Sequence, residues 1–574
     1  MKTRASTLDP GAAARCAFRT VLEHDELSPS PVRGEPDDTV QRRFDAASLH
    51  RLDVAEALLE LHGHRAVDAG LDETATRDAL ASSDTDVVVR PRLPRDDRQR
   101  RHGAPSLLVA ERVDGAVSWR PVDVHNHFVT ADGTKRFLAS SLTYPALRDA
   151  VANEGRRLRK GGAWRRDLLR LAHHHRMLEA MGVASGAPAL AGIIDRSSTL
   201  WWLRLDEPLD ARGSALAQYD ARFAERVALV EATEARNADP TLSRPGSAWW
   251  HRECESCPFG AACHDELAAI DDVSLVRFTD ATEQELLRDN GVLTRRQLAS
   301  LDLGDVARGR ATADEPSDAT TSSAVAVGRR LKDADRLVRR ARVEVAGTVL
   351  RLVGADRLDA RRADVEIDFD MESYDNATYL WGTVVTTRVP TPGIVEGYRP
   401  FVEWGELSAL AEGRIFVAFF DWLADTVRIA AAAGRTVGIY CFWEHAELGQ
   451  MRRAMNSGVP GLPTPDSIES VLGAPLVDLH QVVTSQIQTA GPAGLKVVAG
   501  AAGFVWRDGD PSGEASMGWY ESAVGSDAAA AAAARRRLLE YNEDDCRATR
   551  ALRDWLEGPA RHLPDVEGAR PTDS

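Results

Sequence analysis

The sequence contains no run of about 18 consecutive apolar residues, which a membrane-spanning helix would require. Its first residues, from Met1 to Cys16, also lack the apolar core of a secretory signal peptide. No internal repeat of fixed period is present. We therefore expect a cytoplasmic protein with no membrane partner. Its 574 residues are too many for one ordinary domain, so we expect two or three.

Positive charge and cysteine are both scarce. The formal net charge is −16, which argues against broad, sequence-independent coating of nucleic acid. It does not exclude a nuclease, because clustered acidic groups that hold divalent metals lower the net charge themselves. Only six cysteines are present, and in a reducing compartment they exclude a disulfide framework. Their spacing is therefore more informative than their number.

Changes of pattern along the chain divide it into four segments. Residues 1–271 mix helical and strand patterns and end in a cysteine cluster. Residues 272–345 indicate a helical hairpin, with short helices at 283–289 and 294–300, and a flexible linker at 304–323. Residues 346–558 begin with three strands and continue with alternating helices and strands. Residues 559–574 are expected to form a disordered tail, and the fold class is α/β.

A predicted strand at 365–372 carries alternating carboxylates. Residues two apart in a strand share a face, so Asp368, Asp370 and Glu372 are expected on one face and apolar side chains on the other. Like charges at this spacing repel one another unless cations lie between them. The alternative interpretation is the solvated face of an edge strand.

A predicted helix at 535–555 places Tyr541 and Asp545 one turn apart on one face. A carboxylate at this position can hold a metal, and a neighbouring phenol can orient a water for attack. A spacing of four on a helix also arises by chance. The pair is informative only together with the carboxylates at 365–372.

Asp-x-Glu on a first strand, followed by Tyr-x-x-x-Asp on a late helix, resembles the DEDDy family of 3′→5′ exonucleases. The resemblance implies an RNase H-like fold with a mixed sheet and a fourth acid on a helix after a central strand, here 437–442. Glu447 is the preferred fourth acid and Glu444 its rival. Mg²⁺ or Mn²⁺ would be the cofactor, because hard cations take oxygen ligands. The family pattern implies these roles: metal ligands Asp370, Glu372, Glu447 and Asp545, with Tyr541 positioning water.

Three cysteines, Cys254, Cys257 and Cys263, have the spacing C-x₂-C-x₅-C in a loop broken by proline and glycine. Three thiolates at this spacing indicate a metal site. A tetrahedral site needs a fourth ligand. The candidates in the sequence are His264, His251 and the distant Cys16.

One cysteine near the N-terminus and three near the end of the domain resemble the RecB-like nucleases that carry an iron–sulfur cluster. The resemblance implies a 4Fe–4S cluster held by Cys16, Cys254, Cys257 and Cys263, with Zn²⁺ as the alternative.

The RecB-like, PD-(D/E)xK core requires an acid on one strand and (D/E)-x-K on the next. The matching positions are Ser106, Asp123 and His125, predicted on a hairpin of 107–109 with 119–124. Only the middle acid is retained, so we expect a degenerate domain that binds nucleic acid without cutting it. The histidine run at 173–175 is interpreted as a polar helix face, with a metal site as the alternative.

The two resemblances together predict a cytoplasmic exonuclease that acts on nucleic acid, with single-stranded DNA favoured, in repair or recombination. One alternative is an RNA-processing exonuclease. Another is a non-catalytic nucleic-acid-binding scaffold for a repair partner. A helicase is a candidate partner in either case.

Overall fold

The computed structural model describes residues 6–28, 38–113, 115–159, 163–276, 281–311, 322–375, 377–405, 407–509 and 513–571. Within these residues, every helix is too short or too polar to cross a membrane. The chain divides into two compact units. The first comprises residues 1–248 and 253–265, and the second comprises residues 249–252 and 266–574.

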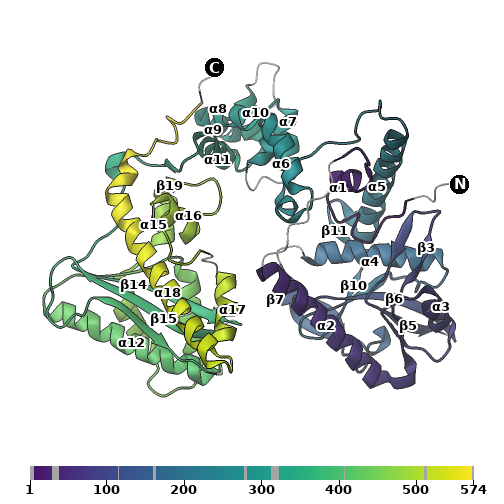
Figure 1. Cartoon of the computed structure of the whole chain (residues 1–574), viewed down its shortest axis with the longest axis horizontal. Coiled ribbons are helices and arrows are strands. Elements are labelled where there is room, and N and C mark those ends of the chain that lie inside the picture. The colour runs from purple at the N-terminus through teal and green to yellow at the C-terminus, as the bar shows by residue number, and fades with distance from the viewer. Residues whose placement is uncertain are drawn as a thin grey trace. The chain divides into compact units, whose positions relative to one another are not determined.

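The first unit is built on an eight-stranded sheet in the order β1-β2-β5-β6-β9-β10-β7-β8 (Figure 1). The hairpin of β5 (Leu107–Val113) and β6 (Ala116–Val124) is antiparallel, as predicted, and β6 runs parallel to β9 (Leu190–Ile194). The other strands are β1 (Ala66–Asp68), β2 (Val87–Val89), β3 (Leu93–Asp96), β4 (Arg101–Gly103), β7 (Thr130–Ser140), β8 (Val151–Leu158), β10 (Leu200–Arg204), β11 (Pro208–Asp210) and β12 (Gly213–Ser214). The helices are α1 (Ala17–His24), α2 (Asp38–His62), α3 (Glu73–Ala81), α4 (Ala163–Ala180) and α5 (Ala215–Ala238).

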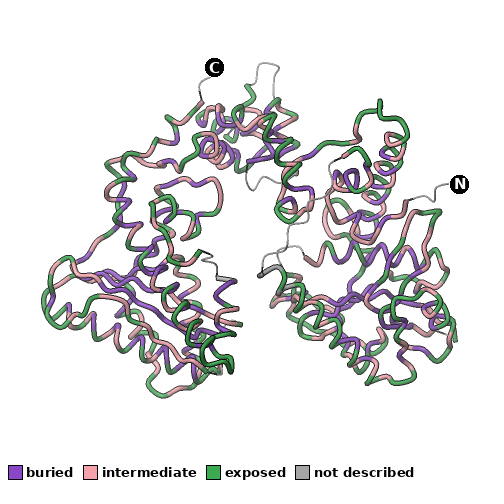
Figure 2. Tube along the Cα trace, in the orientation of Figure 1, coloured by how far each residue is buried: buried purple, intermediate pink, exposed green. Residues whose placement is uncertain are grey.

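Both faces of this sheet are covered. Successive side chains of a strand point to opposite faces, so Val87 of β2 joins a core with Leu58 of α2, whereas Val88 joins a core with Leu178 of α4. Figure 2 shows the resulting buried strands. In this arrangement α4 packs against β6, so residues that follow the end of β6 can contact side chains of α4.

The second unit begins with a helical module. It contains α7 (Ala281–Asp289), α8 (Arg295–Ser300), α9 (Leu303–Ala311), α10 (Ser323–Arg330) and α11 (Ala334–Ala346). The predicted helices at 283–289 and 294–300 are confirmed as α7 and α8. Before them, α6 (Gly260–Ala269) spans the boundary between the two units.

The predicted flexible linker at 304–323 is wrong over its first part, where α9 forms, and residues 312–321 lie outside the described residues. A Cβ at Gly309 would lie 2.1 Å from the Val325 carbonyl oxygen, and a Cβ at Gly328 would lie 2.1 Å from the Val306 carbonyl oxygen. Small residues here permit close helix packing between α9 and α10. The same composition suggested a loop in the sequence.

A five-stranded sheet follows in the order β16-β15-β14-β17-β18. Strands β14 (Val365–Tyr374), β15 (Ala377–Thr387) and β16 (Gly397–Val402) pair antiparallel, which confirms the predicted start of this domain. Strands β17 (Val437–Cys441) and β18 (Leu476–Asp478) continue the sheet in parallel with β14. The remaining elements are β13 (Leu350–Arg351), β19 (Ile487–Gln488), α12 (Ala409–Ala432), α13 (Glu444–Ala454), α14 (Pro465–Leu472), α15 (Leu479–Gln486), α16 (Leu495–Ala501), α17 (Gly513–Ala523) and α18 (Ala528–Glu557).

The last residues of the chain differ from the predicted disordered tail. A short 3₁₀ helix covers Pro559–His562, and Val566 is buried against Leu350. Arg342 of α11 donates a hydrogen bond of 2.8 Å to the Val566 carbonyl oxygen. Residues 559–571 are therefore part of the fold, because they cover the apolar contact between α11 and β13.

Candidate active site

Strand β14 carries four acids on one face, Glu366, Asp368, Asp370 and Glu372. The apolar residues between them pack with α12 in one core. The acids face α18, which lies across the sheet (Figure 1). Helix α18 presents to them four side chains at intervals of four residues: Tyr541, Asp545, Thr549 and Arg553.

Arginines neutralise the first two acids. Arg553 donates to Asp368 at 2.9 Å and contacts Glu366 at 3.3 Å, and all three residues are almost fully buried. Arg362 adds a 2.7 Å bond to Glu366. Burial alone would raise the pKa of Glu366, but the two guanidinium groups hold it below its usual range. Asp368 therefore belongs to a structural ion pair, although it shares the predicted carboxylate face.

The other two acids meet a third carboxylate. Oxygens of Asp370, Glu372 and Asp545 lie within 4.8 Å of one another. Within the described part of the chain, the cation in ion-pair contact with this group is Lys496, whose Nζ lies 3.6 Å from Asp545 Oδ2. Burial raises the pKa of all three, and for Asp370 and Glu372 the neighbouring carboxylates raise it further. One lysine cannot neutralise three carboxylates. Their oxygens therefore fit a hard divalent cation.

The structure separates the two candidates for the fourth acid. Glu447, in the first turn of α13, is buried, and its Oε2 has no hydrogen-bond partner. Burial and the charge of Asp370 raise the pKa of Glu447 well above its usual range. Glu444 is half-buried and accepts a hydrogen bond from Gln481 at 3.3 Å instead. Glu447 lies outside the group of oxygens within 4.8 Å of one another, but its buried oxygen is unsatisfied and feels the charge of Asp370, which favours it over Glu444 as a further ligand.

Tyr541 lies against the same group. It is buried, and the Nζ of Lys496 donates to its hydroxyl at 2.7 Å. Burial and the adjacent Asp545 raise its pKa, so the phenol stays protonated at neutral pH. A protonated phenol positions a water by hydrogen bonding and does not itself remove a proton.

Three further side chains hold the carboxylates in place, and no sequence pattern singled them out. Asn542 donates to Asp370 at 3.0 Å, Ser516 to Glu372 at 3.1 Å, and Trp506 to Asp545 at 2.7 Å. Asn542 lies next to Gly382 of β15, where an added Cβ would lie 1.5 Å from its amide oxygen. Ser516 and Trp506 come from segments with no periodic pattern, so only the tertiary structure identifies them.

Asp478, the last residue of β18, has a structural role. Its carboxylate accepts from the His480 amide at the start of α15 and from the Trp443 amide, both at 2.9 Å. The two bonds join the ends of β17 and β18. They fix the start of α13, and with it the direction of Glu447.

The four cysteines of the first unit lie on two segments that meet. The Cys16 amide donates to the Glu253 carboxylate at 3.1 Å. Burial raises the pKa of Cys16, and the nearby Cys257 contributes. Among the described residues, no cysteine belongs to a group of metal-ligand side chains whose donor atoms converge within 4.8 Å. Zn–S bonds of about 2.3 Å would bring the sulfur atoms closer than that, so the arrangement is more open than a zinc site.

The residues matched to the RecB-like core lie together at the β5–β6 hairpin. The Ser106 amide donates to Asp123 at 3.0 Å, and His125 follows the end of β6. Asp123 is buried, and one of its oxygens lacks a hydrogen-bond partner. Burial alone would raise its pKa, but the nearby His174, His125 and Arg170 hold it below its usual range.

The sequence predicted a solvated polar helix face for the histidines at 173–175. This prediction is wrong. All three side chains are buried. His173 hydrogen-bonds Tyr219 at 2.9 Å and the His102 carbonyl oxygen at 3.1 Å. Burial lowers the pKa of His174 to about 4. The histidines are core residues of α4, held neutral by desolvation.

Residues 448–557 match the family model described as the RNase_H superfamily. The C-terminal region contains an RNase H-like domain. Such domains are generally metal-dependent nucleases, and this one has a candidate carboxylate metal group. The match includes Tyr541 and Asp545 and begins one residue after Glu447. No curated protein and no solved structure matches the chain.

Proposed function

We propose that the chain is a 3′→5′ exonuclease whose RNase H-like domain hydrolyses nucleic acid, with single-stranded DNA as the favoured substrate. The observation that carries the proposal is the contrast along β14. Arginines match Glu366 and Asp368, whereas Asp370 and Glu372 meet another acid, Asp545. A buried cluster of like charges destabilises a fold, and a bound divalent cation compensates for it.

The ligand set in this proposal is Asp370, Glu372, Glu447 and Asp545, with Mg²⁺ or Mn²⁺ as the cofactor. A pair of such ions supplies charge neutralisation at the scissile phosphate and a more acidic water. Asn542, Ser516 and Trp506 orient the carboxylates through the hydrogen bonds described above. Tyr541 positions the attacking water, and Lys496 holds the phenol and adds positive charge beside Asp545.

The first unit is proposed to bind nucleic acid without cutting it. Ser106 and His125 occupy the positions where a PD-(D/E)xK nuclease has an acid and a lysine. A serine is a poor ligand for Mg²⁺, and burial lowers the pKa of His125, which keeps it neutral. The charge that this chemistry needs is therefore missing.

A 4Fe–4S cluster on Cys16, Cys254, Cys257 and Cys263 is proposed to join the two ends of this unit. The contact between Cys16 and Glu253 supports it, because it brings residues more than 230 positions apart to one place. Such a cluster supplies a covalent tie between chain segments. Anaerobically purified protein should contain iron and sulfide.

The test of the exonuclease uses full-length protein and matched single-stranded DNA and RNA labelled at the 5′ end. With Mg²⁺ or Mn²⁺, we expect a ladder of products shortened from the 3′ end, with DNA the better substrate. Faster digestion of RNA would favour the RNA-processing alternative. Binding without digestion would favour a scaffold for a repair partner or helicase.

Asp545→Asn is the matched inactive variant. It should abolish digestion of both substrates while leaving the fold intact. Residual cutting that disappears when Asp123→Ala is added would show a second nuclease centre in the first unit. That result would overturn the proposal that only the second unit cuts nucleic acid.

A further inference from the structure

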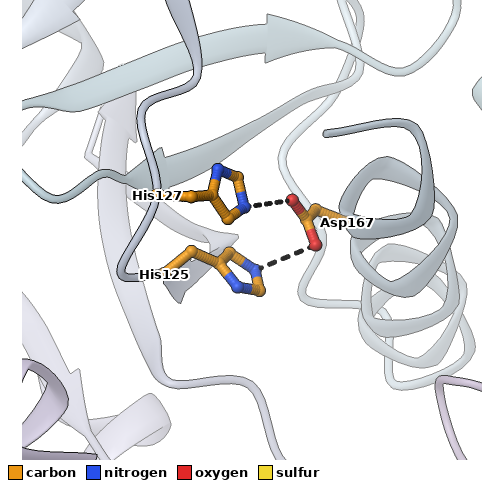
Figure 3. A group of neighbouring side chains, drawn as sticks. All are labelled: His125, His127 and Asp167. Carbon is orange, nitrogen blue, oxygen red and sulfur yellow. Dashed lines mark hydrogen bonds and ion pairs between the residues drawn. The ribbon is translucent and has the colours of Figure 1, made fainter. Parts of the chain in front are cut away.

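The first unit contains a second group of metal-ligand side chains, separate from the C-terminal carboxylates. His125, His127 and Asp167 present donor atoms that all lie within 4.8 Å of one another. Figure 3 shows the two imidazoles on one loop, both facing the carboxylate on α4. His125 Nε2 lies 3.4 Å from Asp167 Oδ1, and His127 Nε2 lies 3.0 Å from Asp167 Oδ2.

The backbone holds this arrangement rigidly. His125 and His127 follow β6, and the end of the neighbouring strand β9 fixes both. The His125 amide donates to the Ile194 carbonyl oxygen at 2.9 Å, and the His127 carbonyl oxygen accepts from the Arg196 amide at 3.2 Å. Asp167 lies in the second turn of α4, which packs on β6. The donors are therefore positioned before any ligand arrives.

One donor has no other partner. His125 Nε2 is buried and makes no hydrogen bond, although it points at Asp167. Burial lowers the pKa of His125, so the ring is neutral and its nitrogen can offer a lone pair. His127 Nδ1 lies 3.5 Å from the Phe128 carbonyl oxygen. A hydrogen bond from one ring nitrogen to a carbonyl is the usual way in which a ligating histidine is oriented.

We propose that His125, His127 and Asp167 bind one transition-metal ion of the Zn²⁺ class. Two imidazoles and one carboxylate form a borderline donor set, which favours Zn²⁺ and its neighbours over Mg²⁺ and Ca²⁺. Three protein ligands leave one tetrahedral position open. The side chains of His127, Asp167 and His125 are 31%, 9% and 17% exposed, so solvent reaches the group from the His127 side.

The charged residues around His125 are consistent with a metal ion of the Zn²⁺ class. Arg170 and Asp123 lie near His125 and act on its charge in opposite directions. Asp123 accepts from the Ser106 amide and is not part of the donor group. The site therefore replaces the oxygen-only set of a PD-(D/E)xK nuclease with a nitrogen-rich one. It does not depend on the proposed exonuclease, whose ligands lie in the other unit.

Equilibrium dialysis of full-length protein against buffered free Zn²⁺ tests the proposal. The critical variant is His127→Gln, because its amide can still donate to Asp167 while the ligand is lost. We expect wild type to hold one more Zn²⁺ than His127→Gln or Asp167→Asn. The affinity of this site should fall by more than the about 10–100-fold typical of losing an outer-shell partner. His64→Ala, which removes an exposed histidine of the same unit, is the matched control and should behave as wild type.

Co²⁺ separates this site from the cysteines. Substitution at an imidazole and carboxylate site gives weak visible bands, whereas thiolate ligands give intense near-ultraviolet absorption. The weak bands should disappear in His127→Gln, and the absorption of whatever metal or cluster the four cysteines hold should remain unchanged. Equal metal counts and spectra in wild type and His127→Gln would overturn the proposal and leave a structural ion pair between loop and helix.

Discussion

Replacing Asp370 by Asn should stabilise the metal-free protein while it destroys the metal site. Coulomb's law with an effective dielectric constant of about 20 gives about 3.5 kcal/mol of repulsion between unit charges 4.8 Å apart. The wild type avoids part of this cost by binding a proton, so we expect a gain of about 1–3 kcal/mol at neutral pH. The asparagine can keep its oxygen toward Asn542 and turn its NH₂ group toward the remaining carboxylates.

Thermal unfolding in EDTA measures this gain. One kcal/mol corresponds to about 2–4 °C in Tm for a unit of this size. The stability gain of Asp370→Asn over the wild type should grow as pH rises, because Asp370 of the wild type then loses its proton. The folded-state pKa of Asp370 is raised, so the contribution of this group to the stability of the wild type is fully present below the unfolded pKa and is lost as pH rises through the folded pKa. The variant lacks this titration.

Added Mn²⁺ should make the wild type more stable than Asp370→Asn. Binding at 100 times Kd stabilises the wild type by about 2.7 kcal/mol, and the variant should gain much less. Asp368→Asn is the matched control two residues away, because it removes one of the two carboxylates that pair with the buried Arg553. Breaking such a pair costs about 3–5 kcal/mol, and this variant should still respond to Mn²⁺. If Asp370→Asn is less stable than wild type in EDTA and responds equally to Mn²⁺, the assignment of a charge-strained metal site is wrong.

Four further outcomes are expected. Glu447→Gln should abolish Mn²⁺-dependent digestion, whereas Glu444→Gln should retain most of it, as measured by initial rates; the reverse result would exchange their roles. Tyr541→Phe should lower kcat by less than loss of a metal ligand does, by about 10²–10³-fold, the range for removal of one positioned hydrogen-bond donor. Gly382→Ala should lower activity by displacing the amide of Asn542, which a Tm measurement would separate from general unfolding. Cys16→Ala should lose iron and sulfide on elemental analysis; retention of all the metal would exclude this cysteine as a ligand.

Local sequence patterns predicted a large part of the C-terminal domain. Strand alternation predicted that Asp370 and Glu372 share a face, and a helical spacing of four predicted that Tyr541 and Asp545 share one. Both signals depend only on the period of a single element, so they are readable without any knowledge of packing. The same is true of the helix start at Asp478, where a short carboxylate caps the following backbone amides.

Packing decided the rest. Asp368 has the same residue type and period as Asp370, and only the distant Arg553 of α18 removes it from the site. The sequence favoured Glu447 over Glu444 but did not decide between them, because the packing of α13 against α12 and β15 determines which one is buried.

The sequence by itself therefore determined the class of the C-terminal domain and most of its carboxylates, because each motif lies within one regular element. It did not determine where segments meet. His125, His127 and Asp167 converge only because the sheet brings the end of β6 beside α4, and no local pattern encodes that distance. The histidines at 173–175 are buried for the same reason. Composition indicates which side chains are polar, whereas the tertiary structure decides which of them lose water and which charges remain to be balanced.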